Sequence, residues 1–363
     1  MGHNFSGEQL RIARIFAGFA LQDLAIKIGN VSKQYLQQLE KNVKLPSEDM
    51  IEALSEALNV EKGFFYQNSS TFIAEEHYHF RKLASTPLFV KEQALSYGQL
   101  LAKFIGYLDD QLNLPIVNFP KYEASTAMEV EKIAEHCRDV WKLGKNTPIK
   151  NMVKVLENAG AIVSYFKGVS DKIDAFSFET NRPIIIRNDA KDSICRMRFD
   201  LAHECGHIVM HECISTGDTE TEAQANRFAS SFLLPREAFF NEFSFLALPR
   251  IQWSMLVERK KRWKVSLAAI FRRAYELGII DAIKYRNANI SLRKNGWTKI
   301  ELGDEFIEKE DPILIKKSIE YFEKKEGAMQ NCIRELNIKK EFLEKLINME
   351  IDIYSGNIIR LYK

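Results

Sequence analysis

Two histidines four residues apart, His203 and His207, enclose a glutamate at position 204. Four residues make about one helical turn, so both imidazoles project from the same face of a helix. Apolar residues flank the pattern on both sides, at Leu201, Ala202, Ile208 and Val209. Imidazoles placed in this way can bind one tetrahedral Zn²⁺ together. The sequence therefore predicts a zinc site on a buried helix.

Glu204 is expected to lie beside the metal rather than on it. In that place its carboxylate can take a proton from water activated by the zinc and later deliver the proton to a leaving amine. The alternative is a buried helix with incidental histidines. Because the chain has only seven histidines, this spacing seldom arises by chance, and we favour the metal site with Glu204 as the catalytic residue.

A catalytic zinc site has three protein ligands and one open position, so a further ligand is needed. His211 continues the stripe of His203 and His207, but no Gly or Pro follows His207 to turn the chain, and His211 should lie a turn too far away. Glu222 opens residues 222–235, whose apolar residues recur at helical spacing. We favour Glu222, with Glu220 and His211 as the alternatives.

At this point the chain resembles the ImmA/IrrE-like metallopeptidases. The resemblance rests on residues 196–207, on residues 222–229 with the following Leu233-Leu234-Pro235, and on residues 173–177, and it covers roughly residues 124–304. It implies gluzincin-like ligation by His203, His207 and Glu222, with Glu204 as the base. It also implies a protein substrate, commonly a repressor or antitoxin-like partner cut in response to stress or to a mobile element. Cys205 departs from the family, where Leu or Ile is usual.

A thiol near the motif suggests one means of regulation. A thiolate is a strong zinc ligand and can occupy the open position until it is oxidised or displaced. Cys205 should point away from the metal because it lies between the two histidines. Cys213, reached by a bend after His211, is the better candidate.

A second motif lies near the N-terminus. Residues 21–29 predict a short helix closed by Gly29, and Ser32 is expected to cap a second helix over residues 33–42. This pattern resembles the Xre/Cro-like helix-turn-helix repressors. The resemblance implies that the second helix enters the major groove of double-stranded operator DNA. The residues expected to face bases or phosphates are Ser32, Lys33, Gln34, Tyr35, Gln37 and Gln38.

The charge of this segment limits how it can bind DNA. Residues 1–66 hold seven basic and eight acidic side chains, a net charge of −1. Non-specific attraction to phosphate is then weak, and binding would depend on a local patch and on a homodimer. The alternative is a small helical bundle used for protein contact. We favour DNA binding.

Composition and patterning set the remaining expectations. The chain has 363 residues, of which 46% are hydrophobic and 28% charged, and no apolar run approaches a membrane span. Charged residues interrupt the first 20 positions, and the five cysteines are scattered, as for reduced thiols. We therefore expect a cytoplasmic protein without a membrane partner.

The predicted fold is α+β and mostly helical. Residues 161–166, 173–178 and 183–187 predict a small antiparallel sheet. The resemblance to gluzincin-like folds implies that an edge strand of this sheet binds the substrate backbone in extended form. A long helix is expected over residues 90–112 and amphipathic helices over residues 313–349. The basic segment 258–273 is interpreted as a solvated part of the peptidase fold rather than a second nucleic-acid surface. The expected domains are a helix-turn-helix domain (1–66), a helical linker (67–120), a gluzincin-like peptidase domain (121–304) and a C-terminal helical region (305–363).

Taken together, these patterns favour a DNA-binding regulator fused to a zinc-dependent endopeptidase. Two alternatives remain. One is a non-proteolytic repressor with a structural or inactive zinc site, and the other is an antitoxin-like binding protein that uses the peptidase fold for docking.

Overall fold

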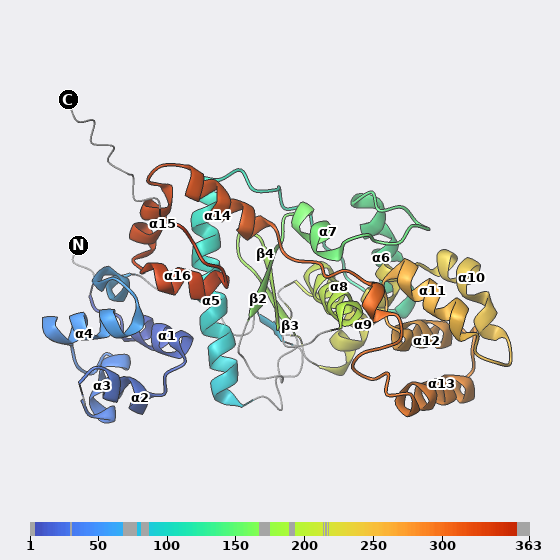
Figure 1. Ribbon diagram of the computed structural model, residues 1–363, viewed down its shortest axis with the longest axis horizontal. Coiled ribbons are helices and arrows are strands. Elements are labelled where there is room, and N and C mark those ends of the chain that lie inside the picture. Colours follow the sequence, from blue (N-terminus) through green and yellow to red (C-terminus); the bar gives the residue numbers. More distant parts are fainter. Residues whose placement is uncertain are drawn as a thin grey trace. The chain divides into compact units, whose positions relative to one another are not determined.

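The computed structural model describes residues 4–29, 31–67, 78–80, 87–166, 175–188, 193–212, 214, 216 and 218–353. The described chain is mostly helical with one small mixed sheet (Figure 1). It divides into two compact units. The first unit combines the N-terminal helices with α5 and the helices after residue 313, and the second unit holds the sheet and the remaining helices. No described helix is both long enough and apolar enough to cross a membrane.

The first unit begins with a small helical bundle. Its elements are α1 (Gly7–Ala17), α2 (Leu21–Lys27), α3 (Lys33–Glu40), α4 (Glu48–Leu58) and the 3₁₀ helix η1 (Lys62–Tyr66). The predicted cap of α3 is confirmed, because Ser32 Oγ accepts a 3.1 Å hydrogen bond from the Tyr35 backbone N–H. A buried ion pair between Arg14 and Glu40, 2.5 Å long, joins α1 to α3. Side chains from α3 therefore hold this helix against the bundle.

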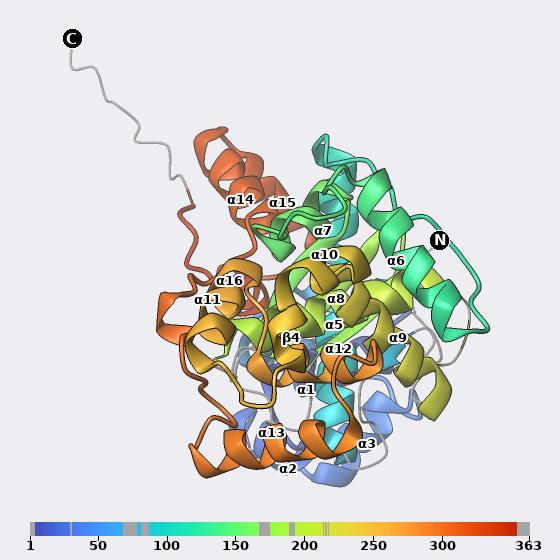
Figure 2. The same ribbon diagram turned by 90° about the vertical axis from the view of Figure 1, so that its right-hand side faces the viewer.

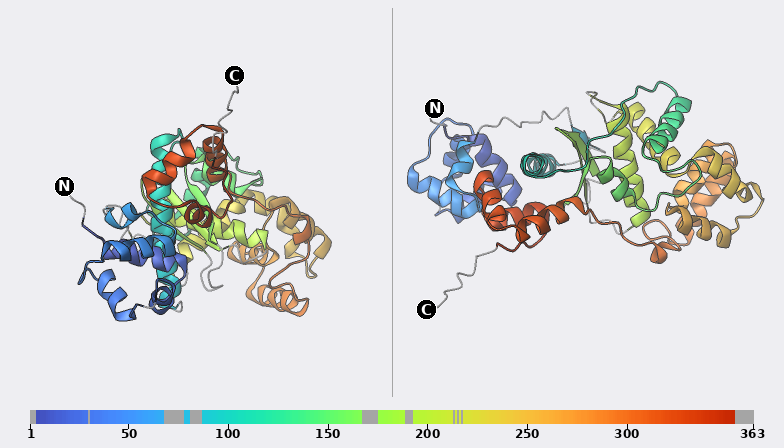
Figure 3. Two further views of the ribbon diagram at one scale, coloured as in Figure 1. Left: turned by 60° about the vertical axis from the view of Figure 1, so that its left-hand side comes forward. Right: turned by 90° about the horizontal axis from the view of Figure 1, so that it is seen from above.

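The C-terminal helices complete the same unit. They are α14 (Leu314–Lys324), α15 (Ala328–Leu336) and α16 (Lys340–Ile347), and they lie with α5 (Leu88–Gln111) beside the N-terminal bundle (Figure 3). Tyr97 on α5 donates a 2.9 Å hydrogen bond to the Leu346 carbonyl. The ring of Phe342 on α16 lies 4.6 Å from that of Phe16 on α1, between ring centroids. Helix α16, near the end of the chain, thus packs in the same core as α1 and α5.

The second unit is built on a four-stranded sheet with the order β1-β3-β4-β2. The strands are β1 (Tyr78–Phe80), β2 (Ile162–Phe166), β3 (Ala175–Glu179) and β4 (Pro183–Asn188). β3 pairs antiparallel with β1 and β4, but β2 runs parallel to β4. The prediction of an all-antiparallel sheet was wrong for β2. A short turn joins β3 to β4. β2 pairs with β4, which does not follow it directly in the chain, so no hairpin sets the direction of β2.

The described part of the second unit also holds eight α-helices, of which α7 and α8 pack against the sheet. They are α6 (Ala127–Val140), α7 (Met152–Asn158), α8 (Ile194–Met210), α9 (Thr219–Leu233), α10 (Arg236–Phe243), α11 (Trp253–Trp263), α12 (Leu267–Glu276) and α13 (Ala282–Lys294), with short 3₁₀ helices η4 (Ser244–Ala247) and η5 (Asp304–Phe306). α8 packs against β3 and β4 and, on its other side, against α9 (Figure 3). The motif helix is therefore buried between a sheet and a second helix.

The basic segment 258–273 is divided between α11 and α12, which follow one another in the second unit (Figure 2). Two of its cations are fully buried. Lys260 Nζ lies 2.7 Å from carboxylate oxygens of both Glu301 and Asp304, and Arg273 contacts Glu131 at 3.0 Å. These two side chains are structural, so the segment is integral to the fold as expected, but it is not solvated at these positions.

Candidate metal centre and DNA-binding helix

Three ligand atoms converge where α8 meets α9. The Nε2 atoms of His203 and His207 lie 3.1 Å apart, and Glu222 carboxylate oxygens lie 3.5 Å from His203 Nε2 and 3.3 Å from His207 Nε2. Ligands about 2.0–2.1 Å from a tetrahedral Zn²⁺ are separated by roughly 3.3 Å. The three groups therefore match one face of a zinc tetrahedron.

Local sequence explains how α9 brings Glu222 to this position. Asp218 caps the helix and accepts hydrogen bonds from the backbone N–H groups of Glu220 and Thr221, which leaves Glu222 in the first turn. A Cβ atom added at Gly206 would lie 3.1 Å from Phe228 on α9. Glycine at this position allows the two helices to approach closely.

Both alternatives for the third ligand lie elsewhere. Among the described residues, the cluster able to hold a metal joins His203, His207 and Glu222, and it contains neither Glu220 nor His211. Glu220 is exposed at the start of α9. His211 is buried at the end of α8, where its ring contacts His207 rather than the point of convergence.

Each candidate histidine ligand has a hydrogen-bond partner on its outer nitrogen. His203 Nδ1 lies 3.1 Å from Asn226 Oδ1 on α9, and His207 Nδ1 lies 2.8 Å from His211 Nδ1. His211 Nε2 in turn lies 2.8 Å from Gln224 Oε1, also on α9. Such partners orient metal ligands and set their tautomers. No pattern in the sequence predicted a role for Asn226 or Gln224, although both fall in the stretch that carried the family resemblance.

The electrostatics of the cluster favour a bound cation. Burial raises the pKa of Glu222, but its contacts with His203 and His207 more than reverse this effect and hold the pKa well below its usual value. Burial lowers the pKa of His211, which favours the neutral imidazole. An ionised carboxylate and two imidazole nitrogens facing one point are a donor set suited to Zn²⁺.

Glu204 faces the sheet instead of α9. Its Oε2 accepts a 2.6 Å hydrogen bond from Ser177 Oγ on β3, and both side chains are buried. The strand thus fixes the carboxylate next to the cluster without making it a member. Ser177 falls in the stretch 173–177 that carried part of the family resemblance, but its role was missed, because no local pattern marks a strand hydroxyl that contacts a helix 27 residues later.

Two cysteines near the motif, Cys205 and Cys213, were considered as thiols that regulate the zinc site. Cys205 packs in the hydrophobic core and is not a member of the ligand cluster, and burial raises its thiol pKa well above the ordinary value. Such a thiol is a poor metal ligand and a poor nucleophile. Cys213 lies outside the described residues.

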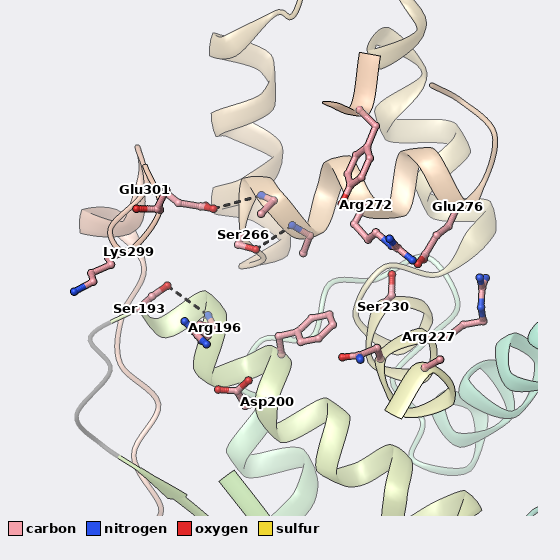
Figure 4. A pocket seen from close by; sticks show the side chains of 17 residues that line it. Ser193, Arg196, Asp200, Arg227, Ser230, Ser266, Arg272, Glu276, Lys299 and Glu301 are labelled. Carbon is pink, nitrogen blue, oxygen red and sulfur yellow. Dashed lines mark hydrogen bonds and ion pairs between the residues drawn. The ribbon is translucent and has the colours of Figure 1, made fainter. Parts of the chain in front are cut away.

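A cavity of about 660 Å³ lies beside α8, α9 and α12 (Figure 4). Helices α8, α9 and α12 contribute most of its walls, and residues 298–301 complete them. Asn226 lines the cavity and also contacts His203. Two acidic residues of the lining are already paired, Glu276 with Arg272 at 2.7 Å and Glu301 with Lys260. The three candidate metal ligands are not among the residues that line this cavity.

In the first unit, α3 presents the predicted DNA-contacting residues outward. Leu36 and Leu39 are buried against the bundle. The six predicted residues are exposed (Ser32, Lys33, Gln34, Gln37) or half-buried (Tyr35, Gln38). One face of α3 therefore holds the helix in place, and the other is accessible.

Comparison with known families agrees with this geometry. Residues 156–275 match the family model of the IrrE N-terminal-like domain, and residues 10–65 match that of the helix-turn-helix. The chain joins a helix-turn-helix domain to an IrrE N-terminal-like domain. No curated protein matches the chain. The IrrE-like domain includes the whole His203–His207–Glu222 cluster, and the predicted resemblance to both families is confirmed.

Proposed function

We propose that this protein is a DNA-binding transcription regulator with zinc-dependent endopeptidase activity, which cleaves a repressor or antitoxin-like protein in a stress, mobile-element or phage response. The observation that carries the proposal is the convergence of His203, His207 and Glu222 within an IrrE-like domain, with Glu204 anchored beside them. Three protein ligands leave one position open, as in catalytic rather than structural zinc sites.

The residues divide the chemistry among themselves. His203, His207 and Glu222 would hold a zinc ion, which would supply the Lewis acidity needed to polarise a peptide carbonyl and to activate water near neutral pH. Glu204 takes a proton from the attacking water and delivers it to the leaving nitrogen, so that the C–N bond breaks as a carboxylate and an amine form. Ser177 donates to Glu204 Oε2 and keeps this carboxylate in position.

The helix-turn-helix domain supplies the regulatory half of the proposal. α3 is short and exposed on the face that carries Lys33, Gln34 and Gln37. Glutamine side chains suit the edges of adenine, and lysine suits guanine or the phosphates. Because the domain has nearly balanced charge, we propose that a homodimer binds two operator half-sites.

The decisive experiment separates the enzyme from a binding protein. Wild-type protein and Glu204→Gln are incubated with candidate repressors from the same genomic neighbourhood, with and without a chelator, and cleavage is read by mass spectrometry. Glu204→Gln should keep its zinc and lose about 10²–10⁴-fold in rate. Glu237→Gln on α10, which is exposed, is the matched control.

A different result would support the alternative. The same two proteins are then compared in a derepression assay. If Glu204→Gln relieves repression of the target as well as wild type does, the protein is a non-proteolytic repressor or an antitoxin-like binding protein with a structural or inactive zinc site.

A further inference from the structure

A second histidine, rather than a carboxylate or an amide, holds the outer nitrogen of His207. The contacts form a chain of four groups. The Ala124 carbonyl accepts from Gln224 Nε2 at 3.0 Å, Gln224 Oε1 lies 2.8 Å from His211 Nε2, and His211 Nδ1 lies 2.8 Å from His207 Nδ1. Both histidines are only 2% exposed. Bulk water therefore has little access to the histidine–histidine contact.

The far end of this chain fixes the positions of the protons. A backbone carbonyl only accepts, so the contact with Ala124 requires the amide NH₂ of Gln224 and turns its oxygen towards His211. His211 Nε2 must then carry a hydrogen, and the Nδ1 of the neutral ring becomes an acceptor. His207 donates from Nδ1 to that acceptor. Its Nε2 keeps the lone pair that points to Glu222 and His203.

The backbone reinforces the same contact. His211 ends α8, and its N–H donates a 2.8 Å hydrogen bond to the His207 carbonyl. The two residues are thus joined through both main chain and side chain. A ring at this position has little freedom to leave His207 Nδ1 and instead approach the metal.

We propose that His211 and Gln224 are positioning residues that hold His207 in the tautomer whose Nε2 binds the metal. This inference rests on the zinc site of the proposed function but not on proteolysis. Without the acceptor at Gln224, His211 can protonate on either nitrogen, and part of the protein holds His207 with its proton on Nε2. Apparent metal affinity falls with the fraction of molecules in the competent state.

The test measures Zn²⁺ affinity of the full-length protein by competition with a chromophoric chelator, together with the visible spectrum of the Co²⁺ form. His211→Phe and Gln224→Met remove the acceptors and should weaken Zn²⁺ binding about 10–100-fold. They should also weaken the absorption bands of tetrahedral Co²⁺. His211→Asn keeps an oxygen able to accept from His207 Nδ1 and should stay within about threefold of wild type. His136→Phe removes an exposed imidazole from α6 and is the control.

The outcomes decide between a positioning role and a packing role. Wild-type Zn²⁺ affinity in either His211→Phe or Gln224→Met overturns the proposal, and so do equal losses in His211→Asn and His211→Phe. Gln224 is half-buried, so Gln224→Met gives the answer if His211→Phe does not fold. Since no substrate is used, a protein that cleaves nothing still gives a clear result, and failure of the peptidase proposal is distinguished from failure of this one.

Discussion

The Ser177 hydroxyl on β3 donates a 2.6 Å hydrogen bond to the Glu204 carboxylate on α8, and Ser177 is completely buried. This contact joins the sheet to the proposed general base. α9 holds the ligand side of the same centre through Glu222, Gln224 and Asn226. The site therefore depends on α8 being placed between two different partners, a strand and a helix.

Loss of the strand contact should impair catalysis without removing the metal. A hydrogen bond to a charged group contributes about 1.5–3 kcal/mol, so Ser177→Ala should lower kcat/KM about 10–100-fold, with zinc content unchanged. Cleavage rates and metal analysis measure both effects. Ser164→Ala, a buried serine on β2, is the matched control. A wild-type rate for Ser177→Ala would mean that Glu204 needs no support from the strand.

The two glutamates at the start of α9 should behave differently. Glu222→Ala removes a proposed ligand, so zinc content should fall and the thermal melting temperature should lose its dependence on added zinc, because bound metal stabilises the folded state. Glu220→Ala, at an exposed position in the same turn, should resemble wild type. If Glu220→Ala loses zinc and Glu222→Ala retains it, then Glu220 is the ligand and Glu222 is not.

Operator binding should depend on the exposed face of α3. The double variant with Gln34→Ala and Gln38→Ala should no longer bind a promoter-proximal operator. Each lost base contact should cost about 1–3 kcal/mol of binding free energy. Lys33→Ala should weaken binding to all sequences and reduce the salt slope by about one. Gel shifts at several salt concentrations distinguish the two effects. Gln99→Ala on α5 is the control, and a double variant with wild-type affinity would exclude α3 from DNA recognition.

Lys103 on α5 should make the stability of the first unit depend on pH. Burial lowers its pKa from 10.5 to about 8, while Nζ contacts the Gln67 side-chain oxygen and lies 5.3 Å from the centre of the Phe64 ring. Between about pH 8 and 10.5 the unfolded state binds more protons at this group than the folded state does. The contribution of Lys103 to the free energy of unfolding therefore rises with pH, by up to about 3 kcal/mol.

Removal of this ammonium group should abolish that dependence. Lys103→Met should be more stable than wild type at pH 7, and the difference should disappear as the pH approaches 10.5. Urea unfolding at several pH values measures it, with the exposed Lys316→Met on α14 as the control. A difference between Lys103→Met and wild type that stays constant with pH would show that Lys103 titrates normally.

Several local features followed from the sequence because neighbouring residues encode them. The spacing of His203 and His207 requires only one helical turn, and the cap at Ser32 requires only the next three residues. The long helix predicted over residues 90–112 corresponds to α5, and the amphipathic pattern of residues 313–349 to α14, α15 and α16. These features depend on periodicity and on short-range hydrogen bonds, which are visible in a single sequence.

The expectation for the third ligand was only partly local. The sequence indicated Glu222 through a helix start and a family resemblance, with Glu220 two residues away as an alternative. The choice between them in space depends on which side of α9 faces α8. The absence of a side chain at Gly206 allows that close approach, and Phe228 packs against Gly206. Neither residue type by itself indicates a metal site.

Only the tertiary structure decided the parallel pairing of β2 with β4, the contact of His211 with His207, the support of Glu204 by Ser177 and the packing of α16 on α1. Each of these contacts joins groups whose relation is set by how elements pack rather than by their spacing along the chain. His211 illustrates the difference most directly. Its spacing predicted that it lies on the same helix face as His203 and His207. The amide of Gln224, on another helix, determines which ring nitrogen of His211 carries the proton. Hydrogen bonds between separate elements leave no periodic trace in a sequence, since their partners are brought together only when the core forms.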